Sequence, residues 1–234
     1  MSKNDLLVFV GTVGSGKSTQ IEKLSSKLES EEYRAKKYFL KTGHLFAYIF
    51  EVLLAQLFVS EKQDVSPIRA LLTERPEVFK RLFGIWIFLD LISITAKFIV
   101  KIYIPLKLGY TLLIEEYIPA ILADYIYISK SINLEPGAIS FPIGLISKLA
   151  YLAEPMTVIY LDADTKELSS RWKNRGSRKE VSKYLQMQRS LLLALSKKFS
   201  SEKLVHVNTT NQTVPETLEE ITKELNLKET KKKK

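Results

Sequence analysis

A glycine-rich loop near the start of the chain constrains the fold more than any other segment. The sequence GTVGSGKS at 11–18 fits the pattern G-x-x-x-x-G-K-S. An apolar, β-type run at 6–10 precedes it, and a helical pattern at 17–30 follows it. A strand that turns through such a loop into a helix is the context in which this loop binds phosphate. The sequence therefore predicts a phosphate site here rather than a plain glycine turn.

The residue types of this loop indicate which ligand it binds. Glycines permit backbone angles that let successive N–H groups point at a phosphate, and the helix start adds its positive end. We expect Lys17 to reach the β- and γ-phosphate oxygens of a nucleotide, and Ser18 to offer its hydroxyl to Mg²⁺. The pattern thus predicts ATP and Mg²⁺ as cofactors, held by Gly11, Thr12, Val13, Gly14, Ser15, Gly16, Lys17, Ser18 and Thr19.

Short apolar runs that favour β-strands alternate with helical patterns along the chain. The runs lie at 6–10, 37–40, 110–115, 157–162 and 203–207. Near-continuous apolar strands suit a parallel sheet covered on both faces, and the alternation predicts βαβ units in an α/β fold. Helices are predicted at 17–30, 119–131, 166–175, 181–199 and 214–225, with an enlarged helical region at 44–105. The prolines and glycines of 133–144 predict a loop there.

Composition limits the class of protein. The 234 residues, 46% of them hydrophobic, suit a single domain at 1–227, followed by a disordered basic tail at 228–234. The absence of cysteine excludes disulfides and thiolate metal sites, and two histidines are too few for a histidine-rich metal site. A net charge of +9 favours anionic partners. The N-terminus does not read as a signal peptide, so we expect a cytoplasmic protein.

Two long apolar segments, at 44–60 and 83–105, raise the question of a membrane. The second carries Asp90, Lys97 and Lys101, which fall on one stripe of a helix. A charge near the centre of a membrane helix costs about 2.5–3.5 kcal/mol. The pattern therefore favours a buried helix with one polar stripe. Contact with a membrane surface stays open but is less favoured.

Charged residues near the predicted strand ends are the candidates for chemistry. Glu115 ends the third strand, at the sheet edge where ligands bind in open α/β folds, so we expect it to hold Mg²⁺ or orient an acceptor. Glu116 is a weaker candidate. The basic stretch 166–183 is predicted to be a lid, in which Arg171, Arg175 and Arg178 could neutralise charge during phosphoryl transfer.

This layout resembles the thymidylate kinase family over most of the chain. The resemblance rests on GSGKSTQ at 14–20, GYTLLIEEY at 109–117, TVIYLDADTKELSSRWKNRG at 157–176, QRSLLLALSKKF at 188–199 and VHVNTTNQTVPETLEEI at 205–221. It implies a P-loop NTPase fold whose parallel sheet has the order 2-3-1-4-5, ATP–Mg²⁺ as donor, dTMP as the first candidate acceptor, and a homodimer. It also implies that Arg171 lies beside the adenine, with Arg175 and Arg178 as catalytic lid residues alongside Lys17 and Glu115.

The acceptor side departs from that family's pattern. Val13 stands where the family usually has an acid, and Glu116 and Leu91 stand where it has arginines. Each lost arginine removes a charged contact to phosphate worth roughly 1.5–3 kcal/mol. These departures argue against ordinary dTMP unless other cations substitute, the candidates being Lys41, Arg69, Arg75, Lys97 and Lys101.

Three other functions remain open from the sequence. One is a kinase of this type with a different acceptor. Another is an ATP-binding module without kinase activity, docked to a partner or a membrane through 44–105. The third is an ATPase stimulated by nucleic acid, which is the least favoured because much of the positive charge lies in the tail and the lid.

Overall fold

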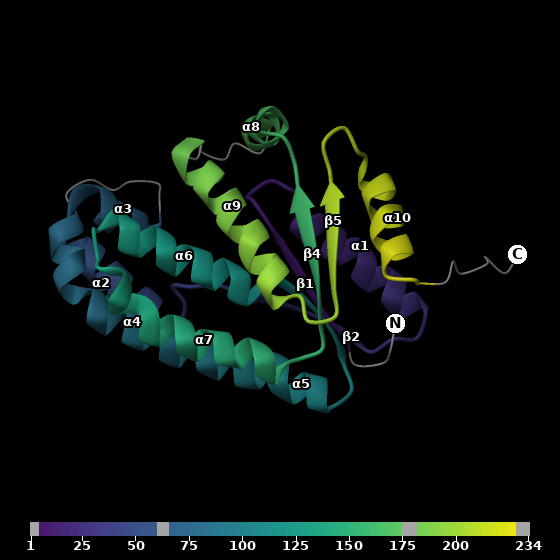
Figure 1. Ribbon diagram of the computed structural model, residues 1–234, viewed down its shortest axis with the longest axis horizontal. Coiled ribbons are helices and arrows are strands. Elements are labelled where there is room, and N and C mark those ends of the chain that lie inside the picture. Colours follow the sequence, from purple (N-terminus) through teal and green to yellow (C-terminus); the bar gives the residue numbers. More distant parts are fainter. Residues whose placement is uncertain (1–4, 60–65, 175–181, 228–234) are drawn as a thin grey trace, which may run out of the picture.

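Five parallel strands form one sheet in the order β2-β3-β1-β4-β5 (Figure 1). The computed structural model describes residues 5–59, 66–174 and 182–227. The strands are β1 Leu6–Gly11, β2 Ala35–Leu40, β3 Thr111–Glu116, β4 Met156–Asp162 and β5 Lys203–Asn208. Both the parallel direction and the order confirm the α/β P-loop fold expected from the sequence.

Helices connect the strands and cover both faces of the sheet. They are α1 Lys17–Ser30, α2 Phe46–Phe58, α3 Pro67–Glu74, α4 Pro76–Phe98, α5 Ile104–Lys107, α6 Tyr117–Ser131, α7 Ser140–Leu152, α8 Thr165–Asn174, α9 Ser182–Phe199 and α10 Val214–Glu224. A π-helical turn, η1 Ile99–Tyr103, joins α4 to α5, and a 3₁₀ turn, η2 Pro136–Ile139, precedes α7. The predicted helical region 44–105 is thus divided among several helices.

The prediction of a loop at 133–144 is wrong in its second half. Pro136 opens η2, and Pro142 lies in the first turn of α7. The first N–H groups of a helix have no partner within the helix, so proline is tolerated there. In this segment the prolines mark the starts of helical turns rather than an irregular connection.

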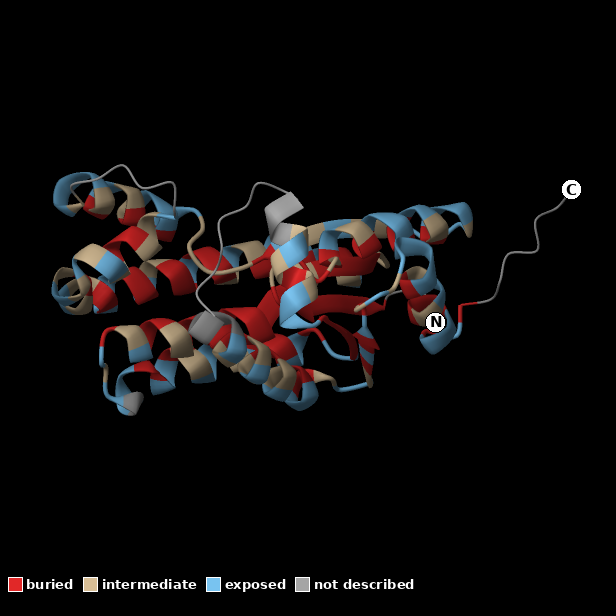
Figure 2. Cartoon of the chain, turned by 90° about the horizontal axis from the view of Figure 1, so that it is seen from above, coloured by how far each residue is buried: buried red, intermediate tan, exposed pale blue. Residues whose placement is uncertain are grey.

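The alternation of side chains along β1 divides the core into two layers. Leu6, Val8 and Val10 pack with α4, α6 and α9, whereas Leu7 and Phe9 pack with α1 and α10. All six residues of β1 are buried, as are the seven of β4 (Figure 2). The sheet is therefore covered on both faces, and its open edge is the row of carboxyl ends of the strands, where ligands bind in such folds.

The long helix α4 contributes both to the core and to the surface. By length and composition, one helical run in the described part of the chain could cross a membrane, Pro76–Lys107, and 44% of its most apolar stretch is buried. The three charges expected to form one stripe differ in burial: Asp90 is fully buried, Lys97 half-buried and Lys101 exposed. The expected polar stripe therefore does not form one uniform face.

Two buried acids fasten the turn after β2 to the helices beside it. The Gly43 N–H donates to Asp90 Oδ1 at 2.9 Å, and the Tyr125 hydroxyl donates to Asp90 Oδ2 at 3.0 Å. The Trp86 indole N–H donates to Glu51 Oε1 at 2.8 Å. A Cβ atom on Gly43 would lie 2.9 Å from the same Glu51 oxygen, and the φ of Gly43 is +70°, so only glycine suits this position.

Burial governs the ionisation of these two acids. Removal from water raises the pKa of Glu51 and that of Asp90 to about 7, against the opposing effect of their hydrogen bonds. Between about pH 4.5 and pH 7 the folded chain therefore holds protons that the unfolded chain releases. Stability should fall as the pH rises through that window.

Replacement of Glu51 by glutamine should remove part of this pH dependence. Glutamine keeps an oxygen for Trp86 Nε1 but does not ionise. Between pH 5 and pH 8 the free energy of unfolding of Glu51→Gln should fall by about 2–3 kcal/mol less than that of the wild type. Urea denaturation at the two pH values measures this, and an equal pH dependence in both proteins would contradict it.

Candidate active site

The glycine-rich loop leaves β1 at the carboxyl edge of the sheet, between β3 and β4. A Cβ atom at Gly11 would collide with the carbonyl oxygen of Leu161 on β4 and would lie 2.7 Å from Ser15 Oγ. The φ angles of Gly14 and Gly16 are +87° and +97°, in the region that favours glycine. Gly16 caps α1, so the loop curls over the N-terminal end of that helix.

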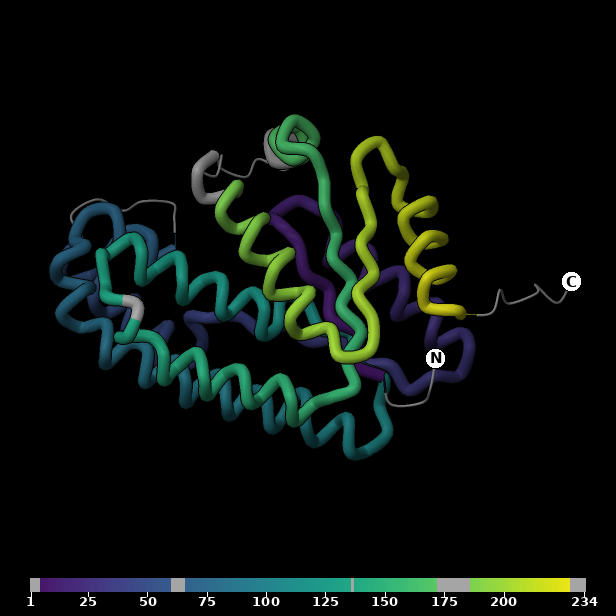
Figure 3. Tube along the Cα trace, in the orientation of Figure 1, coloured from purple at the N-terminus to yellow at the C-terminus, as the bar shows by residue number. Residues whose placement is uncertain are grey.

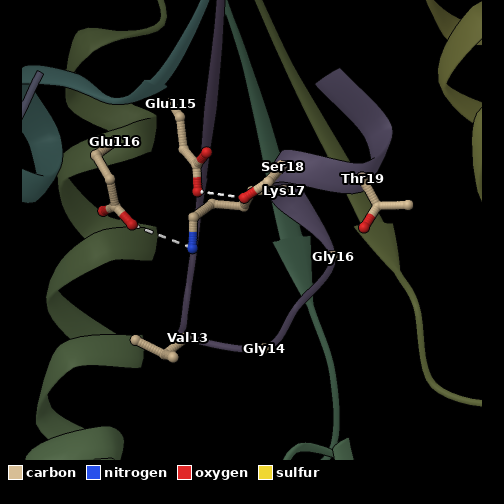
Figure 4. Close-up of a pocket in the computed structure, with 8 residues that line it drawn as sticks. All are labelled: Val13, Gly14, Gly16, Lys17, Ser18, Thr19, Glu115 and Glu116. Carbon is tan, nitrogen blue, oxygen red and sulfur yellow. Dashed lines mark hydrogen bonds and ion pairs between the residues drawn. The ribbon is translucent and has the colours of Figure 1, made fainter. Parts of the chain in front are cut away.

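Lys17 is the first residue of α1, and its side chain folds back across the loop. Its Nζ donates to the carbonyl oxygens of Gly11 and Thr12 at 2.9 and 3.2 Å and lies 3.1 Å from Glu116 Oε1. The side chain is buried. Figure 4 shows its amine extended between the loop and the end of β3. Lys17 therefore connects the loop to the neighbouring strand.

Ser18 and Glu115 form a second link between these elements. The Ser18 hydroxyl donates to Glu115 Oε1 at 2.9 Å (Figure 4). Hydroxyl and carboxylate oxygens are the ligands that Mg²⁺ prefers, and it usually takes one or two carboxylates alongside substrate phosphates. The pair fits the predicted metal site. The cavity beside it is about 160 Å³ and is lined by Val13, Gly14, Gly16, Lys17, Ser18, Thr19, Glu115 and Glu116.

Glu116 also lines this cavity, although the sequence made it a weaker candidate than Glu115. Successive side chains of a strand point to opposite faces, so Glu115 and Glu116 should diverge. However, the φ angles of Glu116 and Tyr117 are +77° and +70°. This strained backbone breaks the alternation and brings both carboxylates to one cavity. Glu116 is 6% exposed, and its Oε2 has no hydrogen-bond partner within the described part of the chain.

Arg171 on α8 links the lid region to the phosphate loop. Its guanidinium donates to the Gly14 carbonyl at 3.3 Å, to Thr209 Oγ1 at 3.1 Å and to the Thr209 carbonyl at 2.8 Å. Thr209 Oγ1 in turn donates to the Asp162 carbonyl at 3.0 Å. Sequence reasoning missed Thr209, although its place directly after β5 at the carboxyl edge was a signal. The predicted lid residues Arg175 and Arg178 lie outside the described residues.

The cations proposed for the acceptor differ in the groups that they contact. The Arg75 guanidinium donates to the Phe58 carbonyl at 2.9 Å, and Lys101 Nζ lies 5.4 Å from the centre of the Tyr38 ring. Leu91, which stands where the resembled family has an arginine, is buried in the core. Of the remaining candidates, Lys41 and Arg69 act electrostatically on the buried Asp124, and Lys97 interacts with the buried Asp90.

Buried acids dominate the electrostatics between β2, α4 and α6. Burial raises the pKa of Asp124, although Lys41 and a hydrogen bond from Thr42 Oγ1 at 2.9 Å oppose that rise. Burial also lowers the pKa of Lys97, against the attraction of Asp90. Burial, with the charges of Lys97 and Lys41, lowers the pKa of His44 to about 4. His44 is therefore neutral near pH 7.

Comparison with known proteins gives a likeness in structure but none in sequence. A scan against protein-family models gave no match, and neither did a sequence search of curated proteins. The structure is similar to that of thymidylate kinase from Candida albicans, with a TM-score of 0.55 and 15% identity, over 97% of this chain and 93% of that one. Thymidylate kinase from Ehrlichia chaffeensis aligns with a TM-score of 0.48 and 18% identity, over 97% of this chain and 100% of that one.

This chain has the thymidylate kinase fold. At 15% identity the likeness shows the fold alone, and it agrees with the family resemblance read from the sequence. The fold does not specify the reaction, so the side chains of the site have to indicate it. There the described residues bring together the loop, Lys17, Ser18, Glu115 and Glu116.

Proposed function

We propose that the chain is an ATP-dependent phosphotransferase that moves the γ-phosphoryl group of ATP to an acceptor bound beside Glu116. One observation carries the proposal: Lys17, Ser18 and Glu115 line a single cavity over the start of α1. A cation, a hydroxyl and a carboxylate at the positive end of a helix are what a nucleotide triphosphate with its metal requires. The fold of the chain supports this function.

Each residue has a part in positioning. ATP with Mg²⁺ supplies the phosphoryl group to be transferred. The loop's N–H groups hold the phosphates, and Lys17 exchanges its carbonyl partners for phosphate oxygens. Ser18 and Glu115 orient the metal, and Arg171 lies beside the adenine. Arg175 and Arg178 remain the proposed arginines that close over the transferring group. Catalysis on this account is chiefly positioning and charge neutralisation.

Removal of the Lys17 amine should abolish transfer. Lys17→Ala is expected to lower the rate from radiolabelled ATP by roughly a hundredfold or more, because the amine neutralises charge on the transferring group. Lys23→Ala, an exposed lysine on the same helix, is the matched control and should keep the wild-type rate. An unchanged rate in Lys17→Ala would refute the proposed site. Tight ATP binding with no transfer by the wild type would favour a binding module instead.

The acceptor has two candidates. The fold makes dTMP the first to be tested, with Lys41, Arg69 and Lys97 as the cations nearest the acceptor side. The second candidate is an acceptor that offers a hydroxyl rather than a phosphate, and Glu116 favours it. A phosphate oxygen is already ionised near pH 7 and a neighbouring carboxylate would repel it, whereas a hydroxyl must lose a proton as it attacks.

In the reaction with a hydroxyl acceptor, one bond to phosphorus forms, one breaks and one proton is transferred. The acceptor oxygen forms a bond to the γ-phosphorus, and the bond from that phosphorus to the β–γ bridging oxygen breaks. The hydroxyl proton goes to the Glu116 carboxylate, whose Oε2 has no partner within the described residues. ADP leaves with the electron pair of the broken bond. The product is a phosphomonoester, whereas dTMP would give a phosphoanhydride.

Replacement of Glu116 by glutamine separates these candidates. With a hydroxyl acceptor, Glu116→Gln should lower kcat by roughly 10²–10⁴-fold, because the base is lost. With dTMP, the same change should leave the rate equal or higher, because it removes a repulsive charge. The assay is transfer to nucleosides, glycerol and all nucleoside monophosphates, with ³¹P NMR to identify the product. Transfer to dTMP unimpaired by the substitution would exclude the hydroxyl acceptor.

A further inference from the structure

The Lys17 amine already has as many partners within the chain as it has N–H donors. It donates to the carbonyl oxygens of Gly11 and Thr12, and Glu116 Oε1 lies 3.1 Å away, within reach of the third donor. An ammonium group has three donors and no acceptor, so this set leaves none for a phosphate. A nucleotide can therefore bind to Lys17 only by displacing one or more of these partners.

Glu116 is the partner that a phosphate would disturb most. Its side chain is buried, and its Oε2 has no hydrogen-bond partner among the residues that the structure describes. Once the Lys17 amine turned to a phosphate, the carboxylate would lie beside a second negative charge and without the ion pair that now offsets its burial. The two loop carbonyls carry no net charge, so the same exchange affects them less.

The backbone at Glu116 is strained and can move when its contacts change. The φ and ψ angles of Glu116 are +77° and −85°, and the φ of Tyr117 is +70°. The first pair is close to the γ-turn that is rare and strained, and neither residue is glycine. The chain passes from β3 into α6 without an intervening residue, so no loop absorbs this strain (Figure 3). The ion pair with Lys17 is a contact that holds the turn in place (Figure 4).

Glu116 also acts on the acceptor side of the site. Its neighbour in β2 is Leu40, which Lys41 follows in the chain. Burial is the main cause that raises the pKa of Asp124, and the charge of Glu116 adds to that rise while Lys41 opposes it. The position of the Glu116 carboxylate therefore influences the acceptor side as well as the glycine-rich loop.

We propose that Glu116 is a latch that holds Lys17 until ATP displaces it. The phosphates of ATP take over the Lys17 amine, the ion pair breaks, and the strained turn carries the freed carboxylate towards the acceptor. A carboxylate paired with an ammonium group is a weaker base than a free one, so Glu116 becomes available to an acceptor hydroxyl only after the donor has bound.

Calorimetric titration of the full chain with ATP and Mg²⁺, without any acceptor, measures the latch. This inference rests on the proposed function, because it takes ATP as the ligand of the loop. Glu116→Gln should bind ATP roughly fivefold or more tightly than the wild type does, because binding no longer has to open an ion pair. Glu116→Asp should also bind more tightly, because it keeps the charge but its shorter side chain loses the contact with Lys17. The matched control is Glu22→Gln, at an exposed acid of α1 that pairs with Lys37, and it should bind as the wild type does.

The two variants at Glu116 separate a latch from simple charge repulsion. If Glu116→Gln tightens ATP binding and Glu116→Asp leaves it at the wild-type value, repulsion between the carboxylate and the phosphates explains the gain, and the latch is wrong. Unchanged or weaker binding by both variants would also overturn the latch, because Glu116 would then support the loop rather than compete with ATP.

Hydrogen exchange on the wild type tests the latch without any substitution. ATP with Mg²⁺ should slow exchange in peptides that cover the loop, 11–18, and speed it in peptides that cover the junction of β3 and α6, 112–120, because the released turn no longer holds the end of the strand. A loop that ATP protects beside a junction that it leaves unchanged or protects would overturn the latch alone. A loop that ATP does not protect would overturn the proposed function, and the latch with it.

Discussion

The contact between Lys17 and the end of β3 determines how the site is assembled. The lysine bridges the carbonyl oxygens of Gly11 and Thr12 and the Glu116 carboxylate, while Ser18 pairs with Glu115. These contacts join the first and third strands at the carboxyl edge of the sheet. They also place two carboxylates beside the glycine-rich loop, and the proposed function rests on this arrangement. In the proposed reaction the loop holds the donor, and Glu116 lies beside the acceptor.

The helical region between β2 and β3 buries two acidic side chains in its interior. These are Glu51 and Asp90, and Asp90 fastens the turn at Gly43 to α4 and α6. Burial, the largest cause, raises the pKa values of Glu51 and Asp90 to about 7. The burial of these two carboxyl groups therefore costs stability as the pH rises.

Local patterns in the sequence predicted the five strands, the phosphate loop and most helices, because each depends on short-range periodicity and on glycine. The strand order came only from the family resemblance, since nothing local specifies which strands pair. The inward turn of Glu116 could not be predicted, because it depends on a left-handed backbone at a residue that is not glycine. Nor could the burial of Glu51 and Asp90, because α2 and α4 have apolar residues on most sides and do not show which side packs in the core. The start of α7 was hidden by prolines that also suit a loop.

The most direct test of the central claim is the effect of Mg²⁺ on ATP binding to the full chain. Calorimetric titrations with and without Mg²⁺ should show that the metal tightens binding to the wild type. A Ser18→Ala, Glu115→Gln double variant should lose that gain, because its two oxygen ligands are gone or weakened. Equal ATP affinity with and without the metal in the wild type, or a full Mg²⁺ effect in the double variant, would contradict the assignment of this cavity.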